Sequence, residues 1–352
     1  MEIEDLNGLL KLFSEPYSHE KVQMIKEWAV KYAIRFLEST GLGRVYTGEV
    51  LRVEMYEHPI SKIEGFKFLG RVQSLDNKYY NVASVIAPVR RRQDIYIEEF
   101  QIANKVARKQ LKVPITGPYT LADWSLNNYY FYKHIKSANS IKEAKKRAKR
   151  ELIFELATKV LRPEILKLRR NGACWIQIDE PALTSHSDKE EMELFTESFN
   201  TITEGVDATF SLHNCYSNYE VLSKYVTDLK KCNQLSLEFA NRDSLRLGIR
   251  SEDRPGYSDL KFFVENGFKG EFGVGVVNVL DYEGAPSKWA NVVEKTLIES
   301  PELIRDRLMY AAKVVGDPSK VSANPDCGLR TRKSWVLIRQ KLENMVKGAS
   351  MS

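Results

Sequence analysis

The stretch WIQIDEP, residues 175–181, joins a short apolar run to ionisable residues at the point where that run ends. The same arrangement recurs along the chain, where TFSL at 209–212 precedes His213 and LSL at 235–237 precedes Glu238. Apolar runs of this length, separated by longer segments of helical character, are typical of buried parallel strands joined by helices. The pattern therefore predicts an α/β protein built from repeated strand–helix units.

Further apolar runs extend this alternation in both directions. The expected strands are VYTGE at 45–49, VPIT at 113–116, EFGVGVV at 271–277 and VSA at 321–323. Apolar residues recur at helical spacing over residues 20–40, 141–171, 188–204, 217–231, 257–266, 301–314 and 333–347. About seven or eight such units without a change in composition favour a (β/α)8 TIM barrel over a doubly wound sheet. The absence of a GxGxxG motif after an early strand also counts against a dinucleotide-binding sheet.

Residues 1–352 are therefore expected to form one barrel domain. The N-terminal segment 1–44 is expected to be largely helical, and the first barrel strand is not assigned within it. Residues 66–100 are expected to form a β-hairpin insertion with a turn near Asp76 and Asn77, because YYNVASVIAPV is rich in β-branched and aromatic residues. The fold prediction is thus an α/β TIM barrel with an N-terminal helical segment and a hairpin insertion.

The composition is that of a soluble globular protein with a sizeable core, with 43% hydrophobic and 28% charged residues. In the basic run IKEAKKRAKRE, 141–151, acids are interspersed at helical spacing, which indicates a solvated helix face rather than a nucleic-acid site. The four cysteines form no CxxC pair, which suits a reducing compartment. No signal peptide is recognisable, and no apolar run approaches the ~20 residues that span a bilayer. We therefore expect no nucleic-acid partner, no membrane association and a cytoplasmic location.

Polar residues stand repeatedly at the point where an expected strand ends. Glu49 follows VYTG, Asp179 follows WIQI and Asn278 follows EFGVGVV. The carboxyl ends of barrel strands form one rim, and the active site of a TIM barrel lies there. The pattern therefore predicts that these residues converge in an active site.

Four strand-end residues are candidates for a shared metal ion. His213 and Cys215 are two residues apart on an extended chain, so both side chains point to the same side of the sheet. Glu238 and Cys327 close two further strands. An imidazole, two thiolates and a carboxylate suit tetrahedral Zn²⁺. Taken singly, the cysteines fit buried core positions and Glu238 fits a loop position equally well.

The chain resembles the C-terminal catalytic barrel of the cobalamin-independent methionine synthases. The resemblance is to a short core form without a second, N-terminal barrel. The matching segments follow the family order and cover nearly the whole chain from about residue 45. They are TGEVLRVEMY at 47–56, ITGPYTLADWS at 115–125, IQIDEPAL at 176–183, LHNCY at 212–216, LSLE at 235–238, GVGVVNV at 273–279 and NPDCGLRTR at 324–332. IDEPAL and NPDCGLRTR are the specific ones among them.

The resemblance implies a role for each matching site residue. It implies a zinc site made by His213, Cys215, Glu238 and Cys327. It also implies that Glu49 and Asp179 hold the amino group of homocysteine, since an ammonium offers three donors and a positive charge to two carboxylates. Trp124 matches the aromatic residue on which the family stacks the methyl-folate ring, and a core position at the start of a helix is its alternative role.

The implied activity is a methyltransferase reaction that moves a methyl group to the thiol of homocysteine and forms methionine. The thiolate is the nucleophile, and a thiol coordinated to Zn²⁺ is deprotonated. Holding both substrates at the rim adds the benefit of proximity. Glu238 takes a catalytic role in this scheme, as the ligand that the substrate sulfur replaces.

Three departures from the family pattern concern the substrate carboxylate and the methyl donor. Residues 1–20 lack the IGSFP-like motif whose Ser helps to hold that carboxylate; Arg52 is one candidate for this role, with a structural salt bridge as its alternative. Leu280 replaces the family's proton-donating His, and Asn278 replaces its Asp. A folate leaving group needs a proton, whereas a cobalt(I) corrinoid does not. With the N-terminal barrel also absent, we expect a methyl-corrinoid or corrinoid protein as donor rather than methyl-folate or another pterin.

Two other functions compete with this one. Another zinc thiol-alkyltransferase, of the coenzyme M type, would share the fold, but Glu49 and Asp179 would repel a sulfonate. A non-catalytic barrel subunit that binds a partner protein would explain the missing first-strand motif. Turnover of homocysteine with a methyl donor separates both from a methionine synthase.

Overall fold

The computed structural model describes residues 16–73, 79–215, 219–279, 298–329 and 334–352, together with Lys11, Phe13 and Ser14. Its main sheet has six parallel strands in the spatial order β10-β9-β8-β7-β6-β5. These strands are β5 Val113–Thr116, β6 Trp175–Asp179, β7 Thr209–Asn214, β8 Cys232–Leu237, β9 Glu271–Val277 and β10 Val321–Pro325. Every run that the sequence analysis assigned to a strand in this region is confirmed.

A short parallel pair continues the sheet beyond β5. It consists of β1 Arg44–Val45 and β4 Gln110–Leu111, and Lys112, the single residue between β4 and β5, donates its backbone N–H to Val45. Seven strand positions thus follow one another round the barrel. Within the described part of the chain, no strand pairing joins β1 to β10, so the strand layer is not closed there.

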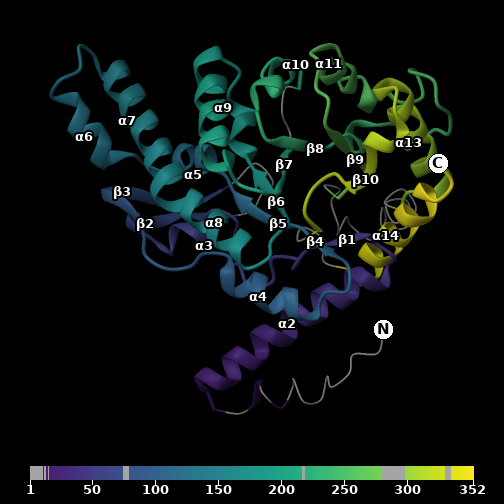
Figure 1. The fold of residues 1–352 in the computed structure, drawn as a ribbon, viewed down its shortest axis with the longest axis horizontal. Helices are drawn as coiled ribbons and strands as arrows, with labels where there is room; N and C mark the ends of the chain where they lie inside the picture. Colours follow the sequence, from purple (N-terminus) through teal and green to yellow (C-terminus); the bar gives the residue numbers. More distant parts are fainter. Residues whose placement is uncertain are drawn as a thin grey trace, which may run out of the picture.

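Helices surround the strands, as Figure 1 shows. They are α2 His19–Ser39, α3 Glu57–Ile60, α4 Ile97–Val106, α5 Pro118–Asp123, α6 Asn128–Ile135, α7 Ile141–Glu155, α8 Arg162–Arg170, α9 Lys189–Thr203, α10 Tyr219–Ser223, α11 Leu260–Glu265, α13 Pro301–Val315 and α14 Trp335–Ala349. A π-helical turn, Leu156–Leu161, joins α7 to α8, so the helix predicted over 141–171 is confirmed. Ser140 and Ser300 begin α7 and α13 by accepting a hydrogen bond from a backbone N–H of the first turn.

The helix predicted over 217–231 is wrong in extent. The structure has only α10 and a 3-10 turn at Val226–Asp228 in this interval. At the end of this interval, the side chain of Asn200 on α9 binds the carbonyl of Asp228 and the N–H of Lys230. These backbone groups are then not available for helical hydrogen bonds. The helix predicted over 257–266 is likewise shorter, since a 3-10 turn at Pro255–Tyr257 precedes α11.

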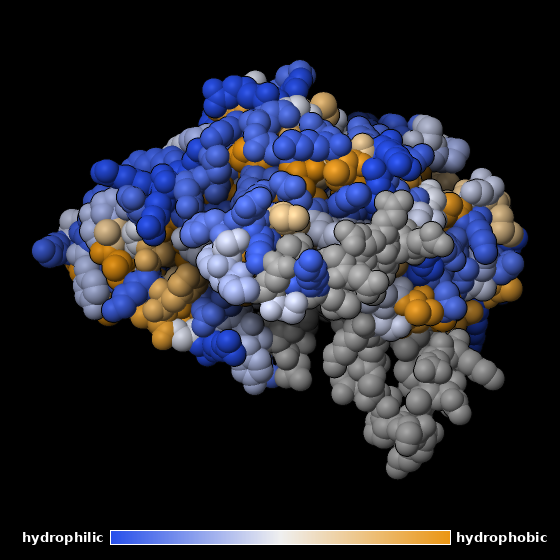
Figure 2. All heavy atoms as spheres, turned by 90° about the horizontal axis from the view of Figure 1, so that it is seen from below, coloured by the Kyte–Doolittle hydropathy of each residue, from blue (hydrophilic) through white to orange (hydrophobic). Residues whose placement is uncertain are grey.

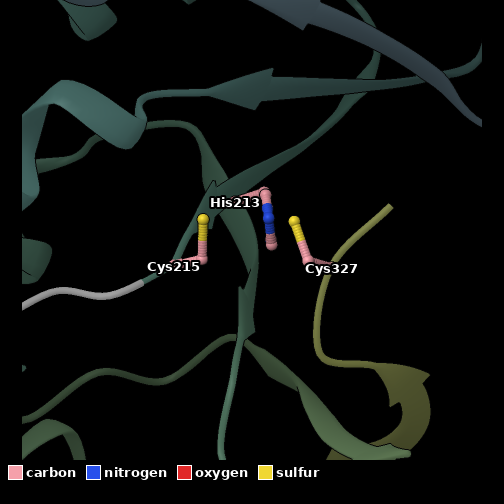
Figure 3. Close-up of side chains that lie close together, drawn as sticks. All are labelled: His213, Cys215 and Cys327. Carbon is pink, nitrogen blue, oxygen red and sulfur yellow. The ribbon is translucent and has the colours of Figure 1, made fainter. Parts of the chain in front are cut away.

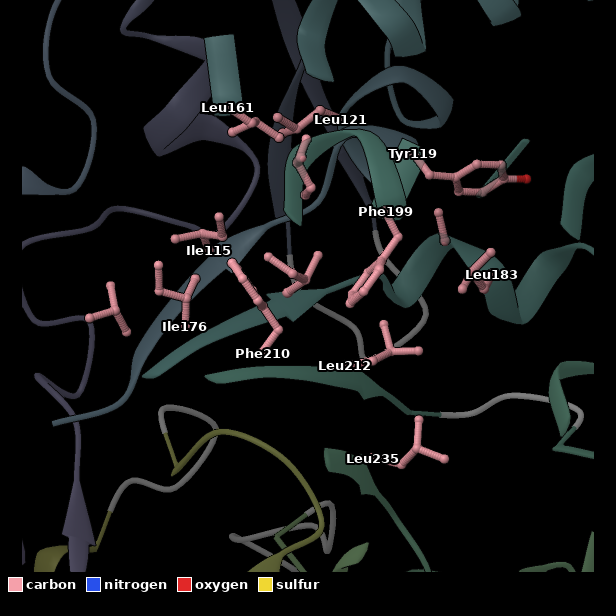
Figure 4. Packing of buried hydrophobic residues seen from close by; sticks show 14 of the residues in the cluster. Ile115, Tyr119, Leu121, Leu161, Ile176, Leu183, Phe199, Phe210, Leu212 and Leu235 are labelled. Atoms are coloured by element: carbon pink, nitrogen blue, oxygen red, sulfur yellow. The ribbon is translucent and has the colours of Figure 1, made fainter. Parts of the chain in front are cut away.

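The strands separate apolar from polar side chains by their alternation. Ile176, Phe210, Leu212 and Leu235 point outward and pack with Phe199 and other helix residues in the buried core (Figure 4). The intervening residues of β6, β7 and β8 point to the opposite face, and most are polar: Gln177, Asp179, Ser211, His213, Gln234 and Ser236. The register places Asp179 beside His213 and His213 beside Ser236. The barrel interior is therefore polar, and Asp179, His213 and Ser236 are its residues nearest the carboxyl ends of the strands.

A hairpin is present as β2 Ile63–Gln73 and β3 Tyr79–Arg91, an antiparallel pair. The predicted range of 66–100 is wrong at its end, because residues 97–100 belong to α4. The predicted turn at Asp76 and Asn77 lies outside the described residues. Figure 1 shows the hairpin at one side of the molecule, beside α6 and α7. The backbone N–H of Val89 donates to the hydroxyl of Tyr130 on α6, at 3.1 Å, so the hairpin is anchored to the helical layer.

The face of the molecule in Figure 2 is largely hydrophilic, and hydrophilic residues divide its apolar side chains into separate patches. Among the described helices, none is both long and apolar enough to cross a membrane.

Candidate metal centre and substrate site

Three potential metal ligands meet at the carboxyl ends of the strands. His213 and Cys215 come from the end of β7, and Cys327 follows β10 by two residues. One ligand atom from each, a ring nitrogen and two sulfurs, lies within 4.8 Å of the other two. Figure 3 shows the three side chains turned toward one another. The structure thus brings together three of the four residues that the sequence analysis assigned to a metal site.

The imidazole of His213 is held in an orientation that suits a ligand. Its Nδ1 atom lies 3.0 Å from the carbonyl oxygen of Ser236, and since a carbonyl only accepts, Nδ1 is the donor. Nε2 is buried, and within the described part of the chain it makes no hydrogen bond of ordinary geometry. A backbone acceptor on one ring nitrogen is the usual support for a histidine whose other nitrogen binds a metal.

The charges of the three groups depend on one another. The hydrogen bond from Cys215 and the neighbouring His213 hold the pKa of Cys327 well below its usual range. The same contact with Cys327, together with burial, raises the pKa of Cys215. Burial alone would lower the pKa of His213, but the Cys327 thiolate raises it to about 9. Two sulfurs and one imidazole nitrogen form a donor set that fits Zn²⁺.

Glu238 lies near these three residues, but its carboxylate oxygens are not within 4.8 Å of all three of their ligand atoms. It follows β8, is 1% exposed and donates its backbone N–H to the hydroxyl of Tyr219. Its negative charge contributes to the raised pKa of Cys215. The assignment of Glu238 as the fourth ligand stays a prediction.

Asp179 and Glu49, the two predicted contacts of the substrate amino group, act on each other electrostatically. Burial raises the pKa of Asp179 to about 7, and the charge of Glu49 contributes to this shift. Glu49 has φ +55° and follows Gly48 at φ +66°, so a tight left-handed turn presents it beyond β1. A buried carboxylate whose pKa is raised further by a neighbouring carboxylate forms, with that neighbour, a favourable site for a cation.

Arg52 binds two carboxylates and the backbone. It lies 2.5 Å from a carboxylate oxygen of Glu49 and 2.8 Å from one of Glu99, and it donates to the carbonyl of Pro114. The guanidinium is only 6% exposed. These contacts agree with the structural salt bridge that was its alternative role, and they fix the position of Glu49.

A chain of hydrogen bonds runs from the barrel interior to Asp179. Lys112 donates to the amide oxygen of Gln177 at 2.5 Å, and the Gln177 amide nitrogen donates to Asp179 at 2.8 Å. A lysine ammonium can only donate, so it holds the amide oxygen of Gln177 toward itself and the amide nitrogen toward Asp179. Sequence reasoning missed Lys112, because a lysine between two short strands carries no motif.

Trp124, which ends α5, lies against the hairpin. Its ring stacks on Tyr80 of β3, with centroids 5.4 Å apart, and is tilted against Tyr56 at 6.2 Å. The indole is partly buried. The alternative role of Trp124, a core position at the start of a helix, is wrong, because Trp124 is half-buried and ends α5. Its stacking on a methyl-folate ring stays a prediction.

Two buried acids beside the predicted site residues were also missed. Glu180 accepts hydrogen bonds from the backbone N–H groups of Tyr119 and Thr120, at the start of α5. Asp326 accepts three hydrogen bonds, from the backbone N–H groups of Phe239, Ala240 and Asn241, which directly follow Glu238. The sequence signal was their position, because each directly adjoins a predicted site residue in IDEPAL or NPDCG.

Comparison with known proteins places this site in a family. The family model described as the catalytic domain of cobalamin-independent synthase matches residues 10–351. The methionine synthase of Thermoplasma volcanium is 38% identical over 341 residues, which cover 93% of this chain and 89% of that protein. The chain belongs to the cobalamin-independent methionine synthases. The predicted family and the predicted enzyme class, a methyltransferase, are confirmed.

Further members of the cobalamin-independent methionine synthase family agree in length and fold. The methionine synthase of Thermococcus kodakarensis is 34% identical over 319 residues, covering 90% of this chain and 80% of that protein. A B12-independent methionine synthase from Shewanella sp. W3-18-1, solved in complex with selenomethionine, superposes with a TM-score of 0.74 at 21% identity, covering 95% of this chain and 89% of the other. A putative vitamin-B12 independent methionine synthase from Listeria monocytogenes gives 0.67 at 15% identity, covering 99% and 93%. The predicted α/β TIM-barrel fold is confirmed.

Proposed function

We propose that this chain transfers a methyl group to the sulfur of homocysteine and forms methionine, with a zinc ion held by His213, Cys215, Cys327 and Glu238. The observation that carries the proposal is the convergence of two sulfurs and an imidazole nitrogen within 4.8 Å at the strand ends. Membership of the cobalamin-independent methionine synthases supports homocysteine as the acceptor.

The residues of the chain have distinct tasks in this reaction. A bound zinc ion would supply a positive charge that keeps a coordinated substrate thiol in its nucleophilic thiolate form. His213, Cys215 and Cys327 would hold the ion, and the backbone carbonyl of Ser236 holds the His213 ring. Glu238 would be the replaceable fourth ligand, whose place the substrate sulfur could take.

Asp179 and Glu49 bind the substrate ammonium. Burial is the main cause of the raised pKa of Asp179, about 7, and repulsion from the charge of Glu49 adds to it. A bound ammonium relieves this repulsion and offers three donors to the two carboxylates. A sulfonate in the same place would be repelled, so the coenzyme M alternative is not favoured.

The methyl donor is proposed to be a methyl-corrinoid or a corrinoid protein. The support comes from Leu280, which stands where the family has a proton-donating His and lies outside the described residues. Trp124 has Tyr80 stacked on its ring, so a flat pterin has less of the indole to stack on. Turnover of homocysteine with methyl-cobalamin and with methyl-folate decides between the donors, and saturable activity with methyl-folate alone contradicts the proposal.

Zinc analysis combined with methyl transfer tests the metal site. Cys327→Ala is expected to lose both bound zinc and activity, and Glu238→Ala to lose activity while keeping most of its zinc through three ligands. Cys232→Ala is the matched control, because Cys232 is a half-buried thiol at the opposite end of β8 and should keep both properties. Full activity in a zinc-free Cys327→Ala protein would end the proposal. Replacing homocysteine with coenzyme M tests the acceptor.

A further inference from the structure

Asp326 joins three neighbouring strands next to the proposed metal site. Its backbone N–H donates to the carbonyl of Val277 at the end of β9. Its Oδ1 atom accepts hydrogen bonds from the N–H groups of Phe239 and Ala240, at 2.8 and 2.9 Å, and Oδ2 accepts one from Asn241 at 2.7 Å. The carboxylate is fully buried. Asp326 directly precedes Cys327, and the loop it binds directly follows Glu238.

The side chain of Asp326 reaches this loop by crossing β9, which lies between β8 and β10. Glycines make the crossing possible. A Cβ atom on Gly275 would lie 2.0 Å from Oδ1 of Asp326, and one on Gly273 would lie 2.3 Å from the amide nitrogen of Asn324. Asn324 makes the equivalent crossing one layer lower and donates to Ser236 at 3.0 Å. The two glycines of EFGVGVV thus leave a groove across β9 for two side chains of β10.

From this geometry we infer that Asp326 is a positioning residue that holds the Glu238 loop in register with Cys327, so that ligands from β8 and β10 converge on one ion. The inference rests on the proposed function, because it assumes that Glu238 and Cys327 share a metal. It adds a named residue that touches neither the ion nor the substrate and acts through the backbone of the Glu238 loop.

A carboxylate is required because all three partners are N–H donors. Asp326 offers two acceptor oxygens and no hydrogen. In Asp326→Asn, one oxygen becomes an NH₂ group that faces at least one backbone N–H, and two donors cannot pair. The loop must then shift away from β10, and Glu238 shifts with it. Substitutions that disturb the partners orienting a metal ligand typically weaken metal affinity by about 10- to 100-fold.

The test measures metal binding to the full chain by competition with a chromophoric chelator, and records the visible spectrum of the cobalt(II)-substituted protein. Asp326→Asn is expected to bind zinc about 10- to 100-fold more weakly than the unchanged protein. Its cobalt spectrum should keep the thiolate charge-transfer band from both cysteines. Its ligand-field bands should match those of Glu238→Ala. The double variant Asp326→Asn/Glu238→Ala should have a zinc affinity no lower than that of the weaker-binding single variant.

Glu164→Gln is the matched control for the loss of a buried carboxylate. Glu164 is fully buried and accepts hydrogen bonds from the N–H groups of Ile95 and Tyr96, at 2.8 and 2.7 Å. It adjoins no proposed ligand. This variant should lose stability as Asp326→Asn does, while its zinc affinity and cobalt spectrum stay unchanged.

Gly275→Ala provides a second route if Asp326→Asn fails to fold, because it displaces the Asp326 carboxylate without removing it. Gly273→Ala disturbs Asn324 one layer lower and should affect zinc binding less. Additive losses in the Asp326→Asn/Glu238→Ala double variant, or a cobalt spectrum of Asp326→Asn identical to that of the unchanged protein, overturn the inference. Failure of the unchanged protein to bind zinc or cobalt overturns the proposed function itself.

Discussion

Lys112 shows how a single side chain inside the barrel can act on the substrate site. Burial lowers its pKa to about 7, yet its role in the structure is geometric. It donates to the amide oxygens of Gln177 and Gln234, at 2.5 and 3.3 Å. The Gln177 amide nitrogen is thereby turned toward Asp179. Lys112 thus helps, through Gln177, to hold Asp179, the proposed acceptor for the substrate ammonium.

Lys112→Met is expected to raise the KM for homocysteine by roughly tenfold, the effect of losing one hydrogen bond to a charged group. Gln177 would then be free to turn its amide oxygen toward Asp179 and repel it. Asp179→Asn should raise KM further, since it removes a charge that pairs with the ammonium. Steady-state kinetics with zinc-loaded protein measure both effects, and zinc content should not change.

Lys109→Met serves as the control, because Lys109 is an exposed lysine just before β4. It should leave KM unchanged. A fall in kcat with unchanged KM in Lys112→Met would contradict the proposed support of substrate binding.

Most residues of the candidate site could be predicted, because they are strand-end residues of unusual chemistry. His213, Cys215 and Cys327 were found in this way, and the structure brings them together. Lys112 had no sequence signal, and Asp326 had only its position beside Cys327. Their roles come from hydrogen bonds to Gln177 and to a backbone loop that only the folded chain brings near.

Among the elements, the hairpin β2–β3 depends on one glycine. Gly65 has φ +94°, and a Cβ atom there would lie 2.7 Å from the carbonyl oxygen of Ala87 and 2.8 Å from that of Pro88. The strand register shifts between Glu64 and Phe66, which identifies a bulge. The bulge bends β2, and a side chain at this position would meet backbone that cannot move away.

Gly65→Ala is therefore expected to lower the free energy of unfolding by about 1–3 kcal/mol, the cost of a strained backbone conformation. Gly70→Ala in the same strand is the control, because a Cβ atom there meets nothing within 4 Å. Urea denaturation of both variants measures the difference. Equal stability of the two variants would contradict the role of the bulge.

Strand positions were predicted more accurately than helix lengths. Strands such as β6 and β7 have apolar residues that must face the core, and this requirement is visible in the sequence. The backbone of Asp228 and Lys230, within the interval predicted as one long helix, is bound instead by Asn200, a residue of α9. A contact between distant parts of the chain leaves no local signal.

At the scale of the whole molecule, helices α2 and α14 contact each other near the part of the barrel where β1 and β10 are not paired. Trp335 of α14 packs edge-on against Tyr32 and Phe36 of α2, with centroids 5.5 and 4.8 Å apart. Gly41, just after α2, leaves room for Val346 of α14. Helices α2 and α14 thus meet in the helical layer. This closure could not be predicted, because no first-strand motif was present to indicate it.

Phe36→Ala is expected to cost about 3 kcal/mol or more of stability, since Phe36 is 4% exposed and its ring links both helices. In metal-free protein, Cys327 should also react faster with a thiol reagent, because α14 follows its loop. Met24→Ala, at an exposed position of α2, should change neither property. Thermal unfolding and thiol titration are the measurements, and an unchanged melting temperature for Phe36→Ala would refute the closure.

The stability of the molecule should also depend on pH through His58. Its ring nitrogen donates to the carbonyl of Ile95, and burial lowers the pKa of His58 to about 4. The unfolded chain takes up a proton near pH 6.5, whereas the folded chain does so only near pH 4. Stability from this group is therefore fully present above pH 6.5 and is lost as the pH falls toward 4.

His58→Gln should flatten this dependence, by up to about 3 kcal/mol between pH 6.5 and 4. Glutamine can still donate to Ile95 but takes up no proton. His19→Gln, at an exposed position, should leave the slope unchanged. Urea denaturation at several pH values gives the comparison, and parallel curves for His58→Gln and the unchanged protein would exclude His58 as the source.

The hairpin has a consequence for how such enzymes diversify. His213 lies on a hydrogen-bonded strand, and Cys215 and Cys327 follow the ends of two such strands within two residues. One residue inserted into these strands would turn every side chain to the wrong face. The hairpin is a separate two-stranded unit that reaches Trp124 through Tyr80. Evolution can therefore exchange or reshape it without disturbing the strands that carry the histidine and the cysteines. A transplanted hairpin offers a way to change which methyl carrier docks, while the nucleophile's chemistry is inherited intact.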